Sequence, residues 1–249
     1  MIGLAEQTEF VERHLGSLGD WLGLGELASH ARDLAAHGDL KASLEAAVAD
    51  VAFFRAKSWD GVLRLGLYRA TQYALVRALD ARAAVETGVL HGLSSNFLLQ
   101  GLADNGAGKL ISIDAPSTFD DGPANADGFN DTLPPGLGPG WVVAEPYRRF
   151  WDLRVGTSTE LLAGVVAELG AIDLFVHDSE HTYETMTFEF EIAWPALRDG
   201  GVLVADNIDV NTAFFDFARA VGRMPYVMPV DPDHAAPGAS GIRFGLLRK

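Results

Sequence analysis

The chain contains no cysteine among its 249 residues. Disulfide bonds, thiolate-bound zinc and a cysteine nucleophile are therefore excluded. The amino-terminal segment has no basic stretch followed by a long apolar run, so we expect no signal peptide. No apolar run reaches the length of about 18 residues that a membrane helix needs. Together these absences predict a soluble, cytoplasmic protein.

Basic residues are also scarce, with 19 lysines and arginines against 34 aspartates and glutamates and a net charge of −15. Proteins that bind nucleic acids or anionic membranes usually carry a basic face. We therefore expect neither kind of partner, and a small molecule as the substrate. Hydrophobic residues make up 48% of the chain, which suits one α/β domain with extra helices.

The first 80 residues are predicted to be largely helical. Apolar residues recur at helical spacing over 44–54 and 62–79, with a break at Asp60-Gly61. We take residues 1–64 as an N-terminal helical extension that would cap the site, cover the sheet or join two copies of the chain. Residues 65–249 are predicted to form the main domain.

After residue 83, short apolar segments alternate with amphipathic ones. The predicted strands are 84–88, 109–114, 153–155, 172–178 and 201–206, with a final antiparallel pair at 226–228 and 242–247. The predicted helices between them are 94–102, 160–169, 183–197 and 211–221. This alternation predicts an α/β fold of Rossmann-like type, with a doubly wound, mostly parallel sheet of seven strands.

The segment 116–146 differs from the rest because it holds six prolines and five glycines without periodicity. Long loops inside a compact domain are usually functional or disordered. We interpret this segment as a lid or substrate loop, with a disordered insertion as the alternative.

Acidic residues stand at the ends of four predicted strands, namely Glu86, Asp114, Asp178 and Asp206. Ligands of open α/β sheets bind outside the carboxyl ends of the strands. Any one of these acids alone is explained by a turn or a helix cap. Four at one edge are costly to bury together unless a cation or a hydroxyl-rich ligand is present. The sequence therefore predicts a ligand site at this edge.

Glu86 begins the turn E-T-G-V-L-H-G-L-S-S, in which Gly88 and Gly92 allow the backbone to approach a ligand closely. The dinucleotide spacing G-x-G-x-x-G is absent, which argues against NAD(P). The spacing E-x-G-x-x-x-G-x-S instead resembles motif I of class I methyltransferases. Asp114, 28 residues after Glu86, ends the next strand, where an acid can accept hydrogen bonds from both hydroxyls of a ribose.

Two later segments extend the resemblance. They are 172–184, I-D-L-F-V-H-D-S-E-H-T-Y-E, and 200–207, G-G-V-L-V-A-D-N. They resemble the methyltransferase-24 group and are similar to the metal-dependent catechol-type and macrolide-sugar O-methyltransferases. The resemblance covers residues 65–249 and implies a class I methyltransferase that uses S-adenosyl-L-methionine.

The resemblance also implies roles for particular residues. His181, three residues after Asp178, corresponds to the general base, with a cap of the next helix as the structural alternative. Asp178, Asp206 and Asn207 would hold Mg²⁺ or Mn²⁺, since these ions prefer hard oxygen ligands. The residues implied to contact the cofactor are Glu86, Thr87, Gly88, Gly92, Ser94, Ser95, Asp114, Gly156, Thr157, Ser158 and Asp178.

The predicted reaction is O-methylation of a hydroxylated small molecule, such as a sugar or a secondary metabolite. Many relatives carry Asp-Asp where this chain has Asp206-Asn207, which leaves metal-independent N-, C- or O-methylation as the alternative. An NAD(P)-dependent oxidoreductase and a non-catalytic binding domain are further alternatives.

Overall fold

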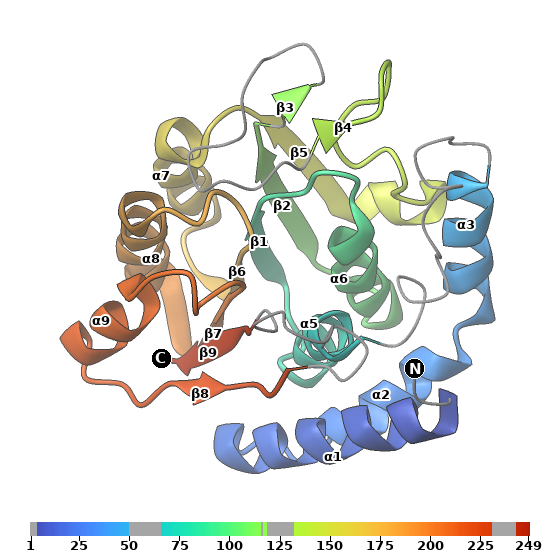
Figure 1. The fold of residues 1–249 in the computed structure, drawn as a ribbon, viewed down its shortest axis with the longest axis horizontal. Helices are drawn as coiled ribbons and strands as arrows, with labels where there is room; N and C mark the ends of the chain where they lie inside the picture. Colours follow the sequence, from blue (N-terminus) through green and yellow to red (C-terminus); the bar gives the residue numbers. More distant parts are fainter. Residues whose placement is uncertain (1–3, 50–65, 116, 119–131, 231–242) are drawn as a thin grey trace.

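The computed structural model describes residues 4–49, 66–115, 117–118, 132–230 and 243–249. Its main feature is a sheet of seven strands. The strands are β1 (Ala83–Thr87), β2 (Lys109–Asp114), β5 (Trp151–Val155), β6 (Ile172–His177), β7 (Leu197–Ala205), β8 (Tyr226–Val227) and β9 (Gly245–Arg248). Their order in space is β5-β2-β1-β6-β7-β9-β8 (Figure 1).

The first five of these strands are parallel, and β9 runs antiparallel to both β7 and β8. The chain builds outwards from β1 through β2 to β5, and then returns to place β6 on the other side of β1. This reversal makes the β1–β6 boundary the switch point at which open α/β sheets bind ligands. The predicted fold class, including the antiparallel final pair, is confirmed.

Helices cover both faces of the sheet (Figure 1). Side chains alternate along each strand, so Ala84 and Leu174 join one hydrophobic cluster while Val85 and Phe175 join the other. The first cluster includes α5 (Leu67–Ala78) and α6 (Leu93–Asp104). The second includes α7 (Ser158–Leu169), α8 (Tyr183–Ala196) and α9 (Ala213–Ala220). Because both faces are covered, the central strands place apolar side chains on both faces, and their polar residues gather towards the strand ends.

The N-terminal helices are α1 (Leu4–Leu22), α2 (Leu27–Ala36) and α3 (Gly38–Val48). They share one hydrophobic cluster with α5 and the sheet, so they are packed onto the main domain. The Arg248 guanidinium donates to the Leu22 carbonyl, and the rings of Trp21 and Tyr226 lie 5.3 Å apart. The predicted boundary at residue 64 falls outside the described residues and stays a prediction. No helix in the described part of the chain is long and apolar enough to cross a membrane.

Several elements differ in their bounds from the prediction, β7 and α8 among them. Strand β7 begins at Leu197 rather than Gly201, because its start pairs with Ile172 before an irregularity shifts the register. Helix α8 ends at Ala196, one residue after Pro195, which has no amide hydrogen to donate to the carbonyl four residues earlier.

The proline- and glycine-rich segment is described only in part. Residues 116 and 119–131 lie outside the described residues, so the lid prediction is untested there. Strands β3 (Ser117–Thr118) and β4 (Thr132–Leu133) form a small parallel pair, and η2 (Glu145–Phe150) leads into β5. The Gly140 and Val142 amides donate to the carbonyls of Leu90 and His91, which fastens this part of the segment to the β1–α6 turn.

One carboxylate fastens the starts of β1 and β6. Asp173 accepts hydrogen bonds from the amides of Arg82 (2.6 Å) and Ala83 (2.9 Å) and from the Arg198 guanidinium. Asp173→Asn should lower the free energy of unfolding by about 1–3 kcal/mol, because the charge of this buried carboxylate, which meets the three donors, is lost. Urea denaturation measures this change. Asp152→Asn, at the more exposed ion pairs with Lys109 and Arg154, is the control and should cost less than Asp173→Asn. Equal losses in the two variants would contradict the prediction.

Candidate active site

The ends of three neighbouring strands place the predicted site residues side by side. In register across the sheet, Thr87 lies next to His177, and His177 lies next to Ala205. The ladder continues one residue further, since the Asp178 amide donates to the Thr87 carbonyl at 2.8 Å and the Asp206 amide donates to the His177 carbonyl at 2.9 Å. Asp178 and Asp206 therefore leave the sheet at the same level, beside the β1 turn.

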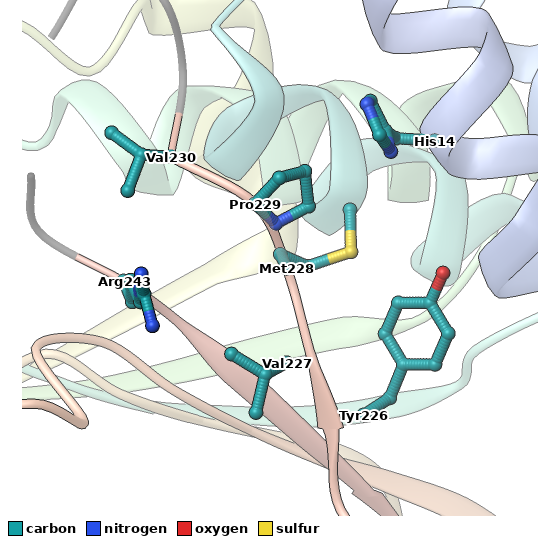
Figure 2. A pocket seen from close by; sticks show the side chains of 7 residues that line it. All are labelled: His14, Tyr226, Val227, Met228, Pro229, Val230 and Arg243. Atoms are coloured by element: carbon teal, nitrogen blue, oxygen red, sulfur yellow. The ribbon is translucent and has the colours of Figure 1, made fainter. Parts of the chain in front are cut away.

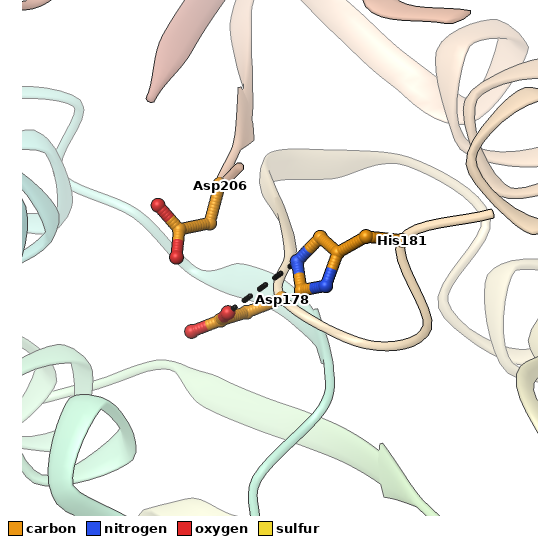
Figure 3. Close-up of side chains that lie close together, drawn as sticks. All are labelled: Asp178, His181 and Asp206. Atoms are coloured by element: carbon orange, nitrogen blue, oxygen red, sulfur yellow. Dashed lines mark ion pairs between the residues drawn. The ribbon is translucent and has the colours of Figure 1, made fainter. Parts of the chain in front are cut away.

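The side chains of Asp178, His181 and Asp206 converge (Figure 3). One potential ligand atom from each lies within 4.8 Å of the others. The His181 Nε2 atom is 3.9 Å from the Asp178 Oδ1 atom, which is too far for a hydrogen bond but within reach of a shared ion. Two carboxylates and an imidazole at this separation can hold a divalent cation.

Asn207 completes this cluster. Its backbone has a positive φ of 51°, and its side chain is buried. The Nδ2 atom lies 3.2 Å from His181 Nε2, so the amide can donate to an unprotonated ring nitrogen. Within the described part of the chain, the buried Oδ1 atom has no hydrogen-bond partner. A buried carbonyl oxygen without a donor fits a metal ligand.

The electrostatics of the cluster favour a bound cation. Burial raises the pKa of Asp178 well above its ordinary value, and the negative charges of Asp206 and Glu86 raise it further. Burial also raises the pKa of Asp206, to about 6. Neighbouring carboxylates in a poorly hydrated place cannot all be ionised without a counter-charge. A bound cation would supply that charge.

Glu86 lies behind the cluster, on the face of the sheet that α5 and α6 cover. Its Oε2 atom accepts hydrogen bonds from the hydroxyls of Ser95 (2.7 Å) and Ser112 (2.8 Å), and its Oε1 atom is buried without a partner. Burial raises the pKa of Glu86 to about 7. The hydroxyl of Ser95, which the sequence predicts to contact the cofactor, thus donates to Glu86.

Asp114 faces the glycine turn. Its carboxylate accepts a hydrogen bond from the Leu90 amide at 3.1 Å, and burial raises its pKa to about 6. Gly88 has a φ of 84°, and a Cβ atom there would collide with the Asp178 carbonyl oxygen. Only glycine therefore allows the β1 turn to pass this close to the end of β6.

A family model described as a methyltransferase domain matches residues 85–208. The match begins within β1 and ends one residue after Asn207, so it includes all four strand-end acids. These residues form a methyltransferase domain. No curated protein sequence matches the chain.

Solved structures show the same class I fold. An O-methyltransferase from Bacillus cereus, in complex with SAH, is 16% identical with a TM-score of 0.53, covering 84% of this chain and 91% of its own. TomG from Streptomyces achromogenes, an O-methyltransferase of tomaymycin synthesis in complex with SAM, is 16% identical with a TM-score of 0.51, covering 85% and 89%. The SAH-bound methyltransferase PaMTH1 from Podospora anserina is 11% identical with a TM-score of 0.52, covering 85% and 87%.

The remaining predicted cofactor residues of the methyltransferase domain have varied surroundings. The Thr87 hydroxyl donates to Glu189, so a cofactor contact is left to its backbone. The Gly156 amide donates to the Asp114 carbonyl, which places the turn after β5 beside Asp114. Thr157 and Ser158 begin α7, and the Thr157 hydroxyl donates to the Glu160 carboxylate. Ser94 is half-buried in the first turn of α6, behind Gly92 with its φ of 88°. Their roles stay predictions.

Two residues of α5 lie close to the acids, although the sequence did not predict them as site residues. The buried Tyr68 hydroxyl has no hydrogen bond of good geometry, and its ring packs against Phe244 at 5.0 Å. Burial and the charges of the nearby Asp178 and Asp206 raise the pKa of Tyr68. Burial lowers the pKa of Arg69, while the same two acids oppose that change. Helix α5 precedes the first motif, so no sequence signal marks these residues.

Three aromatic residues near the predicted lid hydrogen-bond to the body of the methyltransferase domain. Trp141 Nε1 lies 3.0 Å from His91 Nδ1, and Trp151 Nε1 donates to the Ser112 hydroxyl at 2.9 Å. The Tyr147 hydroxyl is bonded to the Gln100 side chain. Tyr147 and Trp151 are thus joined to α6 and β2 at the edge of the core.

A separate cavity of about 510 Å³ lies between α1 and the β8–β9 pair (Figure 2). The residues that line it are His14, Tyr226, Val227, Met228, Pro229, Val230 and Arg243. None of them belongs to the acid cluster, so the cavity does not define the catalytic site.

The raised pKa of Glu86 predicts a pH-dependent stability for the ligand-free protein. The folded state holds a proton that the unfolded state releases near the ordinary value of 4.5, so this stabilisation is complete below pH 4.5 and is lost as the pH rises through about 7. The loss amounts to ~3 kcal/mol. Glu86→Gln should therefore unfold with a flatter profile between pH 5 and pH 7.5 than wild type. Urea denaturation at several pH values measures it, and parallel profiles would contradict it.

Proposed function

We propose that the protein is an S-adenosylmethionine-dependent O-methyltransferase for a hydroxylated small molecule. In this proposal Asp178, Asp206 and Asn207 bind a divalent cation, and His181 is the general base. The observation that carries the proposal is the convergence of these four side chains at the ends of β6 and β7, beside the glycine turn of a methyltransferase domain.

The cofactor would bind across the ends of β1 and β2. The class I relatives TomG and the Bacillus cereus enzyme are described with SAM and SAH, which supports this choice. Asp114 accepts the backbone amides of Val89 and Leu90 and has further lone pairs for ribose hydroxyls. The sulfonium and ammonium groups of the cofactor are positive, and Glu86 and Asp178 would offset those charges.

The cation site is supported by the unpartnered Asn207 Oδ1 atom and by the raised pKa values of the two aspartates. Oxygen ligands of this kind suit Mg²⁺ or Mn²⁺. When bound, such an ion lowers the pKa of a hydroxyl group and fixes its position.

His181 is suited to take up the acceptor proton. Imidazole has an ordinary pKa of about 6.5, close to neutral pH. The Asn207 amide can donate to Nε2 and so favours the neutral ring that a base requires. Thr182, not His181, caps α8, because its hydroxyl accepts the Thr185 amide at 3.2 Å. The helix-cap alternative for His181 is therefore wrong.

Metal-independent methylation is the second candidate, and Arg69 is the observation that favours it. Burial raises the pKa of Asp206, and the charge of this guanidinium is one of the smaller effects that oppose the rise. In this candidate, Arg69 would supply part of the positive charge that a metal ion would otherwise provide. The family match identifies a methyltransferase domain, which argues against a nicotinamide-dependent oxidoreductase and against a non-catalytic binding domain.

The expectations of a small-molecule substrate, of no nucleic-acid or membrane partner, and of contacts between copies through the N-terminal helices stay predictions. Cytoplasmic location stays a prediction too.

Calorimetry with S-adenosylmethionine tests the cofactor assignment. Asp114→Ala should weaken binding by about 10- to 100-fold, because hydrogen bonds from the ribose to a charged acceptor are lost. Asp152→Ala, on the neighbouring strand β5, is the control and should bind as wild type does. Absence of binding by the wild type, with Mg²⁺ or with chelator, would overturn the proposal.

Two variants separate the base from the metal ligands. On a hydroxylated acceptor found by screening, His181→Ala should lower kcat by roughly 10²- to 10⁴-fold while Mn²⁺ affinity changes little. Asp206→Asn should weaken Mn²⁺ binding, measured by calorimetry. Loss of Mn²⁺ binding in His181→Ala would make His181 a ligand instead of the base. Full activity in chelator would favour the metal-independent alternative.

A further inference from the structure

Glu189 of α8 is a fully buried carboxylate on the face of the sheet that α7, α8 and α9 cover. Its Oε2 atom lies 2.6 Å from His177 Nδ1 and accepts the Thr87 hydroxyl at 2.5 Å. Its Oε1 atom accepts the Ser179 hydroxyl at 2.6 Å. One side chain thus joins the end of β1, the end of β6 and the loop that leads to His181.

The bonds of Glu189 keep it ionised. Burial alone would raise the pKa of Glu189, but the charge of His177 and the hydrogen bonds from His177, Ser158 and Ser179 outweigh burial and lower the pKa. The charged acceptor makes these hydrogen bonds stronger than those between neutral groups. The carboxylate therefore holds its partners firmly.

Each partner of Glu189 adjoins a residue of the proposed site. Thr87 lies between Glu86 and Gly88, and His177 and Ser179 flank Asp178. Successive side chains of a strand point to opposite faces, so Thr87 turns towards α8 while Glu86 turns towards α6. A shift of Thr87 or His177 would therefore move the neighbouring site residue with it.

A direct contact also leads from this network to His181. The His177 and His181 rings pack edge to face, with their centroids 5.3 Å apart at 77°. Because Glu189 holds the Nδ1 side of His177, it also sets the surface against which the His181 ring rests.

We propose that Glu189 is a positioning residue, which sets the spacing between the β1 and β6 ends and the orientation of the His181 ring. This inference rests on the proposed function for its catalytic meaning. Asp173 joins the opposite ends of the same two strands, away from the proposed site, so its role is to stabilise the fold. Glu189 would in addition position residues of the site. Asp173 is therefore a matched control for Glu189.

The test compares Glu189→Gln with Asp173→Asn in the full chain. Nitrogen-15 NMR of the imidazole rings and calorimetry with S-adenosylmethionine and Mn²⁺ are measured for each, together with urea denaturation. Glu189→Gln should shift the His181 resonances and weaken cofactor binding by about tenfold or more. Asp173→Asn should lose stability while both readouts stay as in wild type.

The inference would be overturned if the Glu189→Gln variant lost stability but kept the His181 resonances and the ligand affinities of the wild type. If Glu189→Gln does not fold, Ser179→Ala removes one of the bonds and should give a smaller shift of the same resonances; no shift in that variant would likewise overturn it. A wild-type protein that binds neither S-adenosylmethionine nor Mn²⁺ would refute the proposed function, and the His181 resonances would still decide the role of Glu189.

Discussion

Three carboxyl groups lie close together at the poorly hydrated edge where β1, β6 and β7 end. The other features of the site follow from which groups compensate their negative charge. Burial raises the pKa of Glu86, Asp178 and Asp206 alike. Serine hydroxyls meet part of the charge on Glu86, and Arg69 lowers the pKa of Asp206. What is left favours positively charged ligands. A sulfonium cofactor has that character, as would the divalent cation of the proposed site.

On the opposite face of the same strand ends, a buried carboxylate has a lowered pKa instead of a raised one. There Glu189 is ionised and has partners on both carboxylate oxygens, three of which are His177, Thr87 and Ser179. The two faces differ by a single residue along each strand, because side chains alternate. A cluster of buried acids is thus fastened to a network whose central carboxylate has partners on both of its oxygens. This combination keeps the ligand-binding residues in place before any ligand arrives.

The class I fold supports many acceptors, and the strand-end motifs do not distinguish among them. Residues outside the motifs must therefore select the acceptor. Tyr68 and Arg69 bring α5 into the site, and Trp141 fastens the neighbouring segment to His91 of the glycine turn. Substrate choice is expected to depend on these parts of the chain.

The alternation of strands and helices, the acids at the strand ends and the glycine turn can all be predicted from the amino-acid sequence. These features arise from local patterns, since strands buried on both faces need apolar residues and the backbone at Gly88 has a φ of 84°, which other residues avoid. The contact of Tyr68 with the acids and the joining of two strands by Glu189 depend on how the elements pack. Both residues lie in helices whose sequence has no motif, and Glu189 resembles any acid of an amphipathic helix. Their roles come from contacts between elements far apart in the chain, which packing alone creates.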